Sequence, residues 1–513
     1  MTLVNAQEVQ WLAASPIGFD INPDIPQHAI ASSDAGHVYV ARSTTLTYLY
    51  GDVYGAAVVE QRDALGEVNW SFTLGDTVLL QHMAAGGNGR VILGGRFFRK
   101  LHLNGGAELP VLNGNEFPET FLIALDSDGN LLWQRNITPN DPQGTNVAAI
   151  TFDHQGRAWY ATCDFFRADI MRLDEQGNDV ETRPMENAKT IGAISFDPWG
   201  GLYVSGAASN PGLSVNGTLY PLAPSYNFFV TRMDASGAAQ WLQSAEDVTF
   251  QRSVVMADAY GHAYLAGTPF DSITFGGIHF HGPEWNSTFF LARLDSTGAF
   301  QWGFQPPMGA PFSGQFDLAR TASLGVNAAG DAVLLGVANG LVEWGNDVVT
   351  NAGGLTDRAV TLLSLDSTGT PQWQLNGGSA DHDVPQGLAV LPGGTCHIAV
   401  QVRDTFLLGP FAVETSAPTL VVARIDPAIG TGIAEPKPDA EQLTAFPSPF
   451  STTFSLAAAD LAGPVQVVVR DASGRVALTS SSRVGLGSSL APGVYLVELL
   501  QGTRRWHARV VKQ

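Results

Sequence analysis

The chain has 513 residues, enough to bury a large core and to form more than one domain. Charged residues make up only 15% of it and apolar residues 45%, which excludes a chain that is disordered throughout. The formal net charge of -21 argues against a nucleic-acid binder, and the lack of an apolar run of about 18 residues argues against a membrane-spanning helix.

The N-terminus reads MTLVNAQEVQW and lacks the basic and long apolar regions of a complete signal peptide. Val4-Asn5-Ala6 nevertheless has the small residues that a signal peptidase accepts, with Gln7 as the mature first residue. One hypothesis makes residues 1–6 a signal-peptide remnant, and the alternative is an ordinary exposed terminus. Detection of Met1 on exported protein would contradict the first hypothesis.

Two short sequence motifs, here called the first and second phrase, alternate along most of the chain. Each occurs seven times, with a mean period of roughly 60 residues. The first is a turn with Gly followed by Y-V-x-G or a similar run, clearest in DPWGGLYVSG (197–206) and DAYGHAYLAG (258–267). The second is an apolar run, then D-x-x-G, then Trp four residues after the Gly. Its aspartates are Asp63, Asp126, Asp174, Asp234, Asp295, Asp366 and Asp426.

Each phrase predicts a β-hairpin. Short runs rich in Val, Phe, Leu and Tyr are typical of strands. The Asp side chain can accept a hydrogen bond from the backbone two residues on, and Gly supplies the positive φ of a tight turn. Two hairpins per repeat give four strands, so the sequence predicts an all-β fold: a seven-bladed β-propeller over residues 7–427.

The strand EVQWLAAS (8–15) has no repeat in front of it, whereas the last repeat, LVVARIDPAIG, has no Trp strand behind it. We therefore expect the N-terminal strand to pair with the strand around Val422 and to close the ring. The tryptophans of equivalent strands are predicted to pack between blades: Trp11, Trp70, Trp133, Trp241, Trp302 and Trp373. The third repeat departs from the pattern, with no Trp after Gly177.

Both short turns of a blade lie on one face, so the long connections lie on the other, where binding is expected. Several long connections contain a small hairpin of their own, as in LSVNGTLYP, ITFGGIHFHG and VEWGNDVVT. Their aromatic residues suit stacking on a sugar, contact with a protein, or packing of the small hairpins. These residues are Tyr48, Tyr50, Tyr54, Phe97, Phe98, Trp285 and Trp344.

The composition of the sequence changes after Pro427, and the repeats end there. Residues 428–442 are rich in Pro, Gly and charge without a period, which predicts a linker. Residues 443–513 contain short alternating strands such as PVQVVVRD and GVYLVELL. Eight Lys and Arg against five acids give residues 436–513 a net charge of +3, so residues 1–435 carry -24. A separate small β-sandwich is predicted.

This segment resembles the C-terminal sorting domain of the bacterial type IX secretion system. The three resembling blocks are LTAFPSPFSTTFSL, VQVVVRDASGRVAL and LAPGVYLVELLQGTRRWHARVVKQ. The matching residues are Pro447, Pro449, Phe450, Phe454, Asp471, Gly474, Arg475, Pro492, Gly493, Tyr495, Gly502 and Lys512. Ser448 stands where the family usually has Asn.

The resemblance implies an Ig-like sandwich, passage through the periplasm, and export by the outer-membrane secretion machinery. It also implies cleavage of the domain, followed by release or attachment at the cell surface. The blade repeats are similar to the SBBP-type β-propeller repeat. The phrase ALDSDGNLLW also resembles the tryptophan-docking repeat of quinone-dependent propeller dehydrogenases, but that repeat usually has one more residue before the Gly and those enzymes commonly have eight blades.

Isolated polar clusters do not amount to a site. Asp126 to Asn130 resembles part of a calcium loop but lacks the later bidentate Glu, so a hairpin turn is favoured. His279 and His281 share one strand face without an evident third zinc ligand. The run Asp381-His382-Asp383 is expected to be solvated, and Cys163 and Cys396 are expected to be free thiols on opposite sides of the ring.

The sequence thus predicts no catalytic set, no metal site and no cofactor. Three classes remain open: a secreted or cell-surface module that binds a glycan or protein, a secreted propeller enzyme acting on polysaccharide or dependent on a quinone, and a scaffold without a ligand. Carboxylates converging on the channel would favour the enzyme.

Overall fold

The computed structural model describes most of the chain, and its two compact units, Thr2–Gly430 and Thr431–Gln513, are considered separately. The residues outside the description are 1–6, 18–27, 34, 46, 50–51, 113–116, 138–145, 247–252, 283–288, 307–314, 320–321, 347, 353–357, 380–382, 428–442, 447–449, 458–464, 472–474, 502–503 and 513. The signal-peptide remnant and the linker predicted from the sequence therefore lie outside the described residues.

The first unit is all-β and consists of four-stranded antiparallel meanders. The first two meanders share the long strand β6, whose first part pairs with β5 and whose second part pairs with β7. Their strands are β2 (His28–Ser32), β3 (Val38–Ser43), β5 (Asp52–Arg62), β6 (Val68–Ala85), β7 (Val91–Phe97), β10 (Glu119–Leu125) and β11 (Leu131–Ile137).

The next two meanders each form a sheet of their own. They comprise β12 (Asn146–Phe152), β13 (Ala158–Cys163), β14 (Arg167–Leu173) and β15 (Asp179–Glu186), then β16 (Ala188–Phe196), β17 (Leu202–Ser209), β20 (Tyr226–Met233) and β21 (Ala239–Glu246). The fifth comprises β22 (Val254–Ala257), β23 (Ala263–Gly267), β26 (Phe290–Leu294) and β27 (Phe300–Phe304).

In the sixth meander, two short inner strands both pair with β30. Its strands are β28 (Gln315–Leu318), β29 (Leu324–Val326), β30 (Ala332–Asn339), β33 (Ala359–Leu365) and β34 (Pro371–Gly378). The last sheet joins β35 (Val384–Val390), β36 (Cys396–Val402) and β39 (Thr419–Pro427) to β1 (Gln7–Pro16).

Strand β1 comes from the opposite end of the unit to β39. The two strands pair antiparallel from Gln7 opposite Pro427 to Pro16 opposite Thr419, with Ala13 opposite Val422. The expected pairing of the N-terminal strand with the strand around Val422 is therefore present. Val9 and Trp11 of β1 are buried, so the strand contributes side chains to the core as well as backbone pairing.

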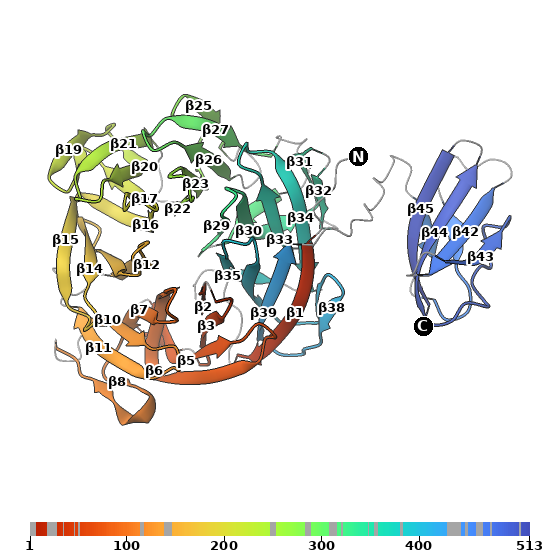
Figure 1. Ribbon diagram of the computed structural model, residues 1–513, viewed down its shortest axis with the longest axis horizontal. Helices are drawn as coiled ribbons and strands as arrows, with labels where there is room; N and C mark the ends of the chain where they lie inside the picture. The colour runs from red at the N-terminus through yellow and green to blue at the C-terminus, as the bar shows by residue number, and fades with distance from the viewer. Residues whose placement is uncertain are drawn as a thin grey trace. The chain divides into compact units, whose positions relative to one another are not determined.

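The meanders follow one another in chain order around a common centre, as the progression of colour in Figure 1 shows. The first strand of each meander lies nearest that centre and the fourth lies outermost. The innermost strands contact one another in succession, β12 with β6 and β16, β22 with β16 and β29, and β35 with β29 and β2. The fold is all-β and β-propeller-like.

The Asp-Gly turns form because the Asp side chain substitutes for missing backbone partners. At the Asp63 turn, Oδ1 accepts hydrogen bonds from the backbone N–H of Leu65 (2.8 Å) and Glu67 (3.0 Å). The Asp63 carbonyl accepts from Gly66 N–H (3.1 Å), and Gly66 has φ of 87°. A register shift follows the turn, as in hairpins with a bulge after a type I turn.

Small hairpins decorate the second-to-third connections, as the sequence predicts for several of them. They involve β4 (Thr47–Leu49) with β5, β8 (Leu101–His102) with β9 (Glu108–Leu109), β18 (Gly212–Val215) with β19 (Thr218–Pro221), β24 (Ile273–Phe275) with β25 (Ile278–Phe280), β31 (Leu341–Gly345) with β32 (Val348–Asn351), and β37 (Phe406–Leu408) with β38 (Phe411–Val413). Strand β18 also pairs with β15, and β37 with β34, which ties each hairpin to the preceding meander.

The second unit packs two sheets around one core. The pair β40 (Thr444–Phe446) and β41 (Ser455–Ala457) forms one sheet, and the other contains β42 (Gln466–Asp471), β43 (Val476–Ser480), β44 (Gly493–Gln501) and β45 (Arg504–Lys512). Phe450, Val497 and Trp506 are among the buried residues that the sheets share. No helix within the described residues of the chain is long and apolar enough to cross a membrane.

Candidate functional site

The motif tryptophans lie against the turn of the next meander. Trp70 Nε1 donates a hydrogen bond to the Ser127 carbonyl (2.8 Å), and a Cβ on Gly129 would lie 2.5 Å from Trp70 Cδ2. A larger residue at Gly129 would displace the indole. The same pair of contacts recurs for Trp11 with Ala64 and Gly66, Trp241 with Ser296 and Gly298, and Trp302 with Ser367 and Gly369.

Two motif tryptophans depart from this pattern. Trp133 covers Gly177, but its Nε1 has no hydrogen-bond partner among the described residues. Trp373 donates to the side-chain oxygen of Gln7 (3.1 Å) when the Gln7 amide is oriented so that its nitrogen donates to the Asp426 carbonyl (3.0 Å). A residue of β1 thus gives Trp373 the acceptor that a turn carbonyl gives elsewhere.

A second set of contacts between meanders comes from the Tyr of the Y-V-x-G phrase. The Tyr39, Tyr203 and Tyr264 hydroxyls donate to the carbonyls of Gly89 (3.3 Å), Gly261 (2.7 Å) and Gly330 (2.6 Å). All three tyrosines are fully buried, and burial raises the pKa of Tyr203 and Tyr264 above the usual range.

The last meander has His397 in the position of these tyrosines. Its Nδ1 lies 2.8 Å from Ser32 Oγ in the first meander. Burial and the nearby Arg424 cation lower the pKa of His397 to about 4, so the ring is neutral at ordinary pH.

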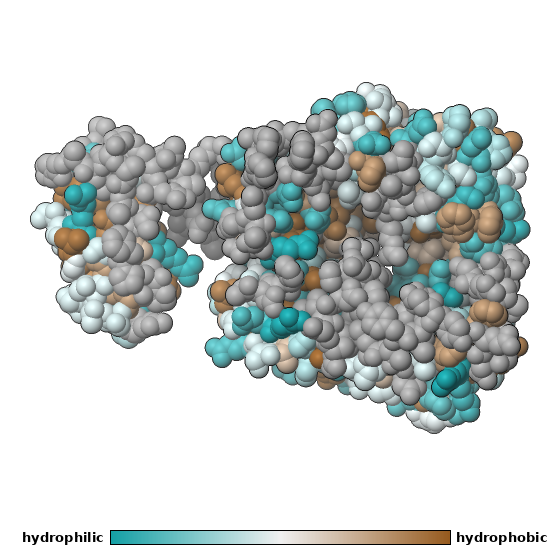
Figure 2. Space-filling view, turned by 180° about the vertical axis from the view of Figure 1, so that it is seen from behind, coloured by the Kyte–Doolittle hydropathy of each residue, from teal (hydrophilic) through white to brown (hydrophobic). Residues whose placement is uncertain are grey.

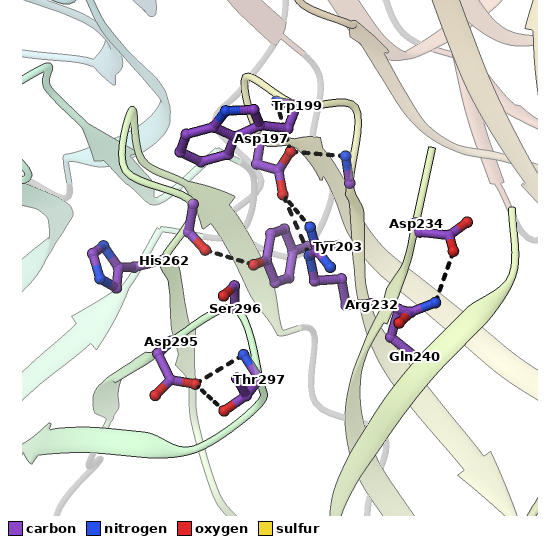
Figure 3. A network of polar contacts seen from close by, with 12 residues as sticks. Asp197, Trp199, Tyr203, Arg232, Asp234, Gln240, His262, Asp295, Ser296 and Thr297 are labelled. Carbon is purple, nitrogen blue, oxygen red and sulfur yellow. Dashed lines mark hydrogen bonds and ion pairs between the residues drawn. The ribbon is translucent and has the colours of Figure 1, made fainter. Parts of the chain in front are cut away.

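Buried carboxylates support the first turns of neighbouring meanders. Asp197 accepts from the backbone N–H of Trp199 (2.9 Å) and Gly201 (2.8 Å) through Oδ1, and from Arg232 Nη2 (2.8 Å) through Oδ2. Figure 3 shows this pair beside Tyr203, whose hydroxyl points to the turn that carries Gly261 and His262. The acceptors of Asp197 are therefore occupied within the protein, which is what a structural carboxylate requires.

The structure describes four of the aromatic residues that were predicted to face a ligand, and all four side chains are buried. Tyr54 and Phe97 are 0% exposed, Trp344 1% and Phe98 3%. Trp344 Nε1 donates to Thr350 Oγ1 (2.8 Å), and its ring contacts those of Phe289 and Phe316. Packing of the small hairpins, the alternative given by the sequence, describes these four residues. Tyr50, Trp285 and the Tyr48 side chain lie outside the described residues.

The isolated polar candidates also have structural partners. Asp126 Oδ1 accepts from the backbone N–H of Asp128 (2.9 Å) and Asn130 (2.8 Å), as a turn aspartate does. The rings of His279 and His281 are 4.7 Å apart, but no group of three or more His, Cys, Asp or Glu within the described residues could hold a metal ion.

The expectation that the run 381–383 is solvated is wrong for Asp383, the one of its three residues that the structure describes. Asp383 is only 1% exposed, because its carboxylate accepts from the backbone N–H (2.6 Å) and hydroxyl (2.8 Å) of Ser379. Asp381 and His382 lie outside the described residues. Cys163 and Cys396 are buried free thiols, as predicted, and burial raises their pKa values to about 11 and about 12.

In the second unit, Lys512 brings the block of residues 443–456 together with the block that ends the chain. Its Nζ donates to the carbonyls of Thr452 (3.1 Å) and Gly487 (3.4 Å) and lies 4.9 Å from the centre of the Phe450 ring. Lys512 is only 9% exposed, so these carbonyls replace most of the water that its ammonium group would bind. Phe450 also packs on Phe454, with ring centroids 4.9 Å apart.

The other described motif residues of this unit act locally. Arg475 N–H donates to Asp471 Oδ1 (3.0 Å) across the β42–β43 turn. Pro492 is exposed before β44, Gly493 begins that strand, and the Tyr495 hydroxyl donates to the Ala491 carbonyl (2.8 Å). Pro447, Pro449, Gly474 and Gly502 lie outside the described residues.

The exposed aromatic residues are not those that the sequence predicts. They include Trp199 (63% exposed), Tyr260 (60%), Phe166 (65%) and Phe165 (45%). Trp199 and Tyr260 occupy the third position of DPWG and DAYG turns, where the second phrase has mostly Ser, Thr or other polar residues. That contrast is the sequence signal that could have identified them. In Figure 2 the hydrophobic residues of the first unit form small areas scattered among polar ones.

Among known proteins, only solved structures are similar to this chain. No family model matches the chain, and no curated protein matches it. Virginiamycin B lyase from Staphylococcus aureus is 12% identical, covering 81% of this chain and 99% of that chain, with a TM-score of 0.41. A protein of unknown function from Bacteroides caccae is 14% identical, covering 68% and 94%, with a TM-score of 0.35.

PorZ, described as a surface component of the type IX secretion system of Porphyromonas gingivalis, is 11% identical, covering 94% of this chain and 81% of that chain. Its TM-score is 0.21. With identities and TM-scores this low, none of these likenesses carries an argument about what this chain binds or does.

Proposed function

We propose that the first unit is a seven-bladed β-propeller closed by β1. The proposal is supported by the succession of contacts among innermost strands, which returns from β35 to β2. The pairing of β1 with β39 and the contact of Gln7 with Trp373 support it as well. A closed ring leaves no unpaired outer strand, which protects the sheet from edge-to-edge association.

The second unit is a type IX sorting domain with an Ig-like sandwich, and the blades are SBBP-type repeats. The single observation that carries the sorting-domain proposal is the buried Lys512, which joins the first and third resembling blocks through the Thr452 carbonyl and the Phe450 ring. The SBBP-type assignment of the blades rests on the sequence repeats alone. On this proposal the protein crosses the periplasm after removal of a signal peptide, meets the outer-membrane secretion machinery, and is secreted or held at the cell surface.

The propeller itself is a non-catalytic binding module. Asp317, 3.5 Å from Arg358, is the one carboxylate that the sequence places on the innermost strands β2, β12, β16, β22, β28, β29 and β35. These strands therefore supply no pair of carboxylates of the kind that glycoside hydrolysis requires. The polysaccharide-degrading or quinone-dependent enzyme and the scaffold without a ligand are the alternatives.

The export proposal is tested by fractionation and intact mass of the protein in its native host. The protein expressed from the full sequence is expected outside the cell or on its surface, without its last 70 to 85 residues. This range corresponds to cleavage in or near the predicted linker 428–442. A chain that ends before residue 443 is expected to remain in the periplasm.

Lys512→Ala gives the sharper variant, with Arg509→Ala as its control. Both remove a cation from β45, but Arg509 is exposed and Lys512 is buried against carbonyls. Lys512→Ala is expected to reduce export severely and Arg509→Ala to leave it unchanged. Full-length protein in the cytoplasm, or equal export of the shortened chain, would overturn the proposal.

A further inference from the structure

Two exposed aromatic rings stand on the first turns of two consecutive meanders of the first unit. Trp199 lies in the turn between β16 and β17, and Tyr260 in the turn between β22 and β23. Both turns are fixed by a buried Asp: Asp197 Oδ1 accepts from Trp199 N–H (2.9 Å), and Asp258 Oδ1 accepts from Tyr260 N–H (2.8 Å). The rings are thus presented on ordered backbone, so little backbone entropy would be lost when they bind a ligand.

The Trp199 and His154 side chains each contact the first turn of the next meander. A Cβ on Gly261, the residue after Tyr260, would lie 2.6 Å from Trp199 Cζ3, so the indole rests on the turn that carries Tyr260. His154 of the preceding meander approaches in the same way, with Cε1 3.4 Å from the Cβ position of Gly200. Figure 3 shows the Trp199 indole extending from the Asp197 turn towards the turn that carries His262. We call His154, Trp199 and Tyr260 the aromatic ledge.

The side-chain polar atoms of Trp199 and Tyr260 differ from those of the aromatic residues that pack between meanders, because they make no hydrogen bond within the described protein. Trp70 Nε1 and the hydroxyls of Tyr203 and Tyr264 donate to backbone carbonyls. By contrast, no residue in the described part of the chain accepts a hydrogen bond from Trp199 Nε1 or from the Tyr260 hydroxyl. Exposed Trp and Tyr that combine an apolar face with an unused donor are typical of binding surfaces.

The charges beneath the ledge are already paired. Asp153 lies 2.7 Å from Arg157, Asp197 lies 2.8 Å from Arg232, and Asp258 lies 2.9 Å from His262 Nδ1 with Arg293 at 3.7 Å. Each of these three described carboxylates therefore has a basic partner within the protein. The net charge of -24 on residues 1–435 additionally repels a polyanion. Trp199 and Tyr260 offer a ligand exposed ring faces and uncharged hydrogen-bond donors, which suit an uncharged ligand.

We propose that the aromatic ledge binds a neutral oligosaccharide. The C–H face of a pyranose ring is flat and apolar and would stack on the Trp199 and Tyr260 rings, while its hydroxyl rim would pair with Trp199 Nε1, the Tyr260 hydroxyl and the His154 ring. The proposal rests on the proposed binding function and names its ligand class. It places the site on the short-turn face rather than on the face of the small hairpins.

The test is isothermal titration of the full chain with neutral hexasaccharides: cellohexaose, maltohexaose, xylohexaose and mannohexaose. At least one is expected to bind, and the double variant Trp199→Ala/Tyr260→Ala is expected to weaken binding at least about tenfold, or about 1.4 kcal/mol. Phe166→Ala, which removes an equally exposed ring from the turn between β13 and β14, should bind like the unmodified chain. Matching thermal midpoints would show that the variants are folded.

Two results would overturn the proposal. One is that none of the four oligosaccharides binds, and the other is that the double variant binds as tightly as the unmodified chain. Capture of a peptide through Trp199 and Tyr260 without sugar binding would instead assign the ledge to a protein partner. Failure here leaves the export proposal intact, because fractionation in the host measures the latter independently.

Discussion

At the scale of single residues, glycine and tryptophan act as a pair across neighbouring meanders. Gly129 has a positive φ of 81°, which the turn requires, and it also leaves space for the Trp70 ring of the preceding meander. The sequence predicts both residues from local chemistry, since D-x-x-G signals the turn. It does not say which indole rests on which glycine, because that depends on the order of the meanders in space.

Gly129→Ala separates these two requirements when it is compared with Gly156→Ala. Gly156 also has positive φ (72°), but a Cβ there meets nothing within 4 Å. Gly156→Ala is expected to lower the free energy of unfolding by about 1–2 kcal/mol through backbone strain alone. Gly129→Ala is expected to lower it by a further 1–3 kcal/mol, roughly, because the Cβ displaces Trp70. Equal losses in chemical denaturation would refute the role given to Trp70.

His397 makes the stability of the first unit depend on pH. Its pKa is about 4 in the folded protein, because burial disfavours the charged ring, against about 6.5 in the unfolded chain. Between these values the unfolded chain binds the extra proton, so stability is lost as the pH falls from about 6.5 to about 4.

His397→Tyr places at this position the residue found at Tyr39, Tyr203 and Tyr264 and removes the titrating group. Its unfolding free energy is expected to change less between pH 6.5 and 4, as measured by denaturation at several pH values. Exposed His154 gives the control, and His154→Gln should keep the original dependence. An unchanged dependence in His397→Tyr would contradict this explanation.

At the scale of elements, counting the strands of each repeat predicted the pairing of β1 with β39. The sequence has a Trp strand without a repeat in front and a repeat without a Trp strand behind, which predicts that the two pair. The register, Ala13 opposite Val422, then places Val9 and Trp11 in the core. The small hairpins, by contrast, show what strand counting does not predict. Their aromatic residues are buried, because the hairpins fold onto outer strands, as β18 does on β15.

Removal of residues 7–16 tests the proposed closure. The outer edge of β39 would lose its partner, and Trp373 would lose the Gln7 oxygen. The shortened chain is expected to lose about 1.5–3 kcal/mol for each large apolar side chain removed from the core and to aggregate through the open edge. Denaturation and light scattering measure both effects. A chain lacking only residues 1–6 is the control, and equal stability of the two would count against closure by β1.

At the scale of the whole molecule, the chain combines two units of different charge and construction. The boundary between Gly430 and Thr431 falls within the segment 428–442 that the sequence predicts to be a linker. The second unit has its own core around Val467, Val497 and Trp506, which does not require residues of the first unit. We therefore expect each unit to survive cleavage of the connection.

Limited proteolysis with a glutamate-specific protease tests that expectation. Glu441 is the predicted first cleavage site, because it lies in the linker and is not followed by proline as Glu435 is. Two fragments that resist further digestion are expected on a denaturing gel. Glu441→Gln should slow this cleavage without opening a new site. Early cleavage inside the β-meanders would show that the unit boundary is misplaced.

The sequence by itself determined the local structure: the alternating hairpins, their Asp and Gly turns, the strand without a partner, and a second unit with its motif blocks. These follow from short-range chemistry, namely the φ of glycine, the acceptor of an aspartate side chain, and the alternation of apolar residues. The same chemistry placed Asp126 in a turn, where Oδ1 accepts from Asp128 and Asn130.

Only the tertiary structure decided which side chains are exposed. Trp344 and Asp383 lie in segments that read as surface loops, yet both are buried. Trp344 packs against Phe316, and Asp383 accepts a hydrogen bond from the Ser379 hydroxyl. Trp199 and Tyr260 read as ordinary turn residues, yet their side chains are 63% and 60% exposed in the folded unit. Burial is a property of what packs against a residue, and a local pattern does not contain it.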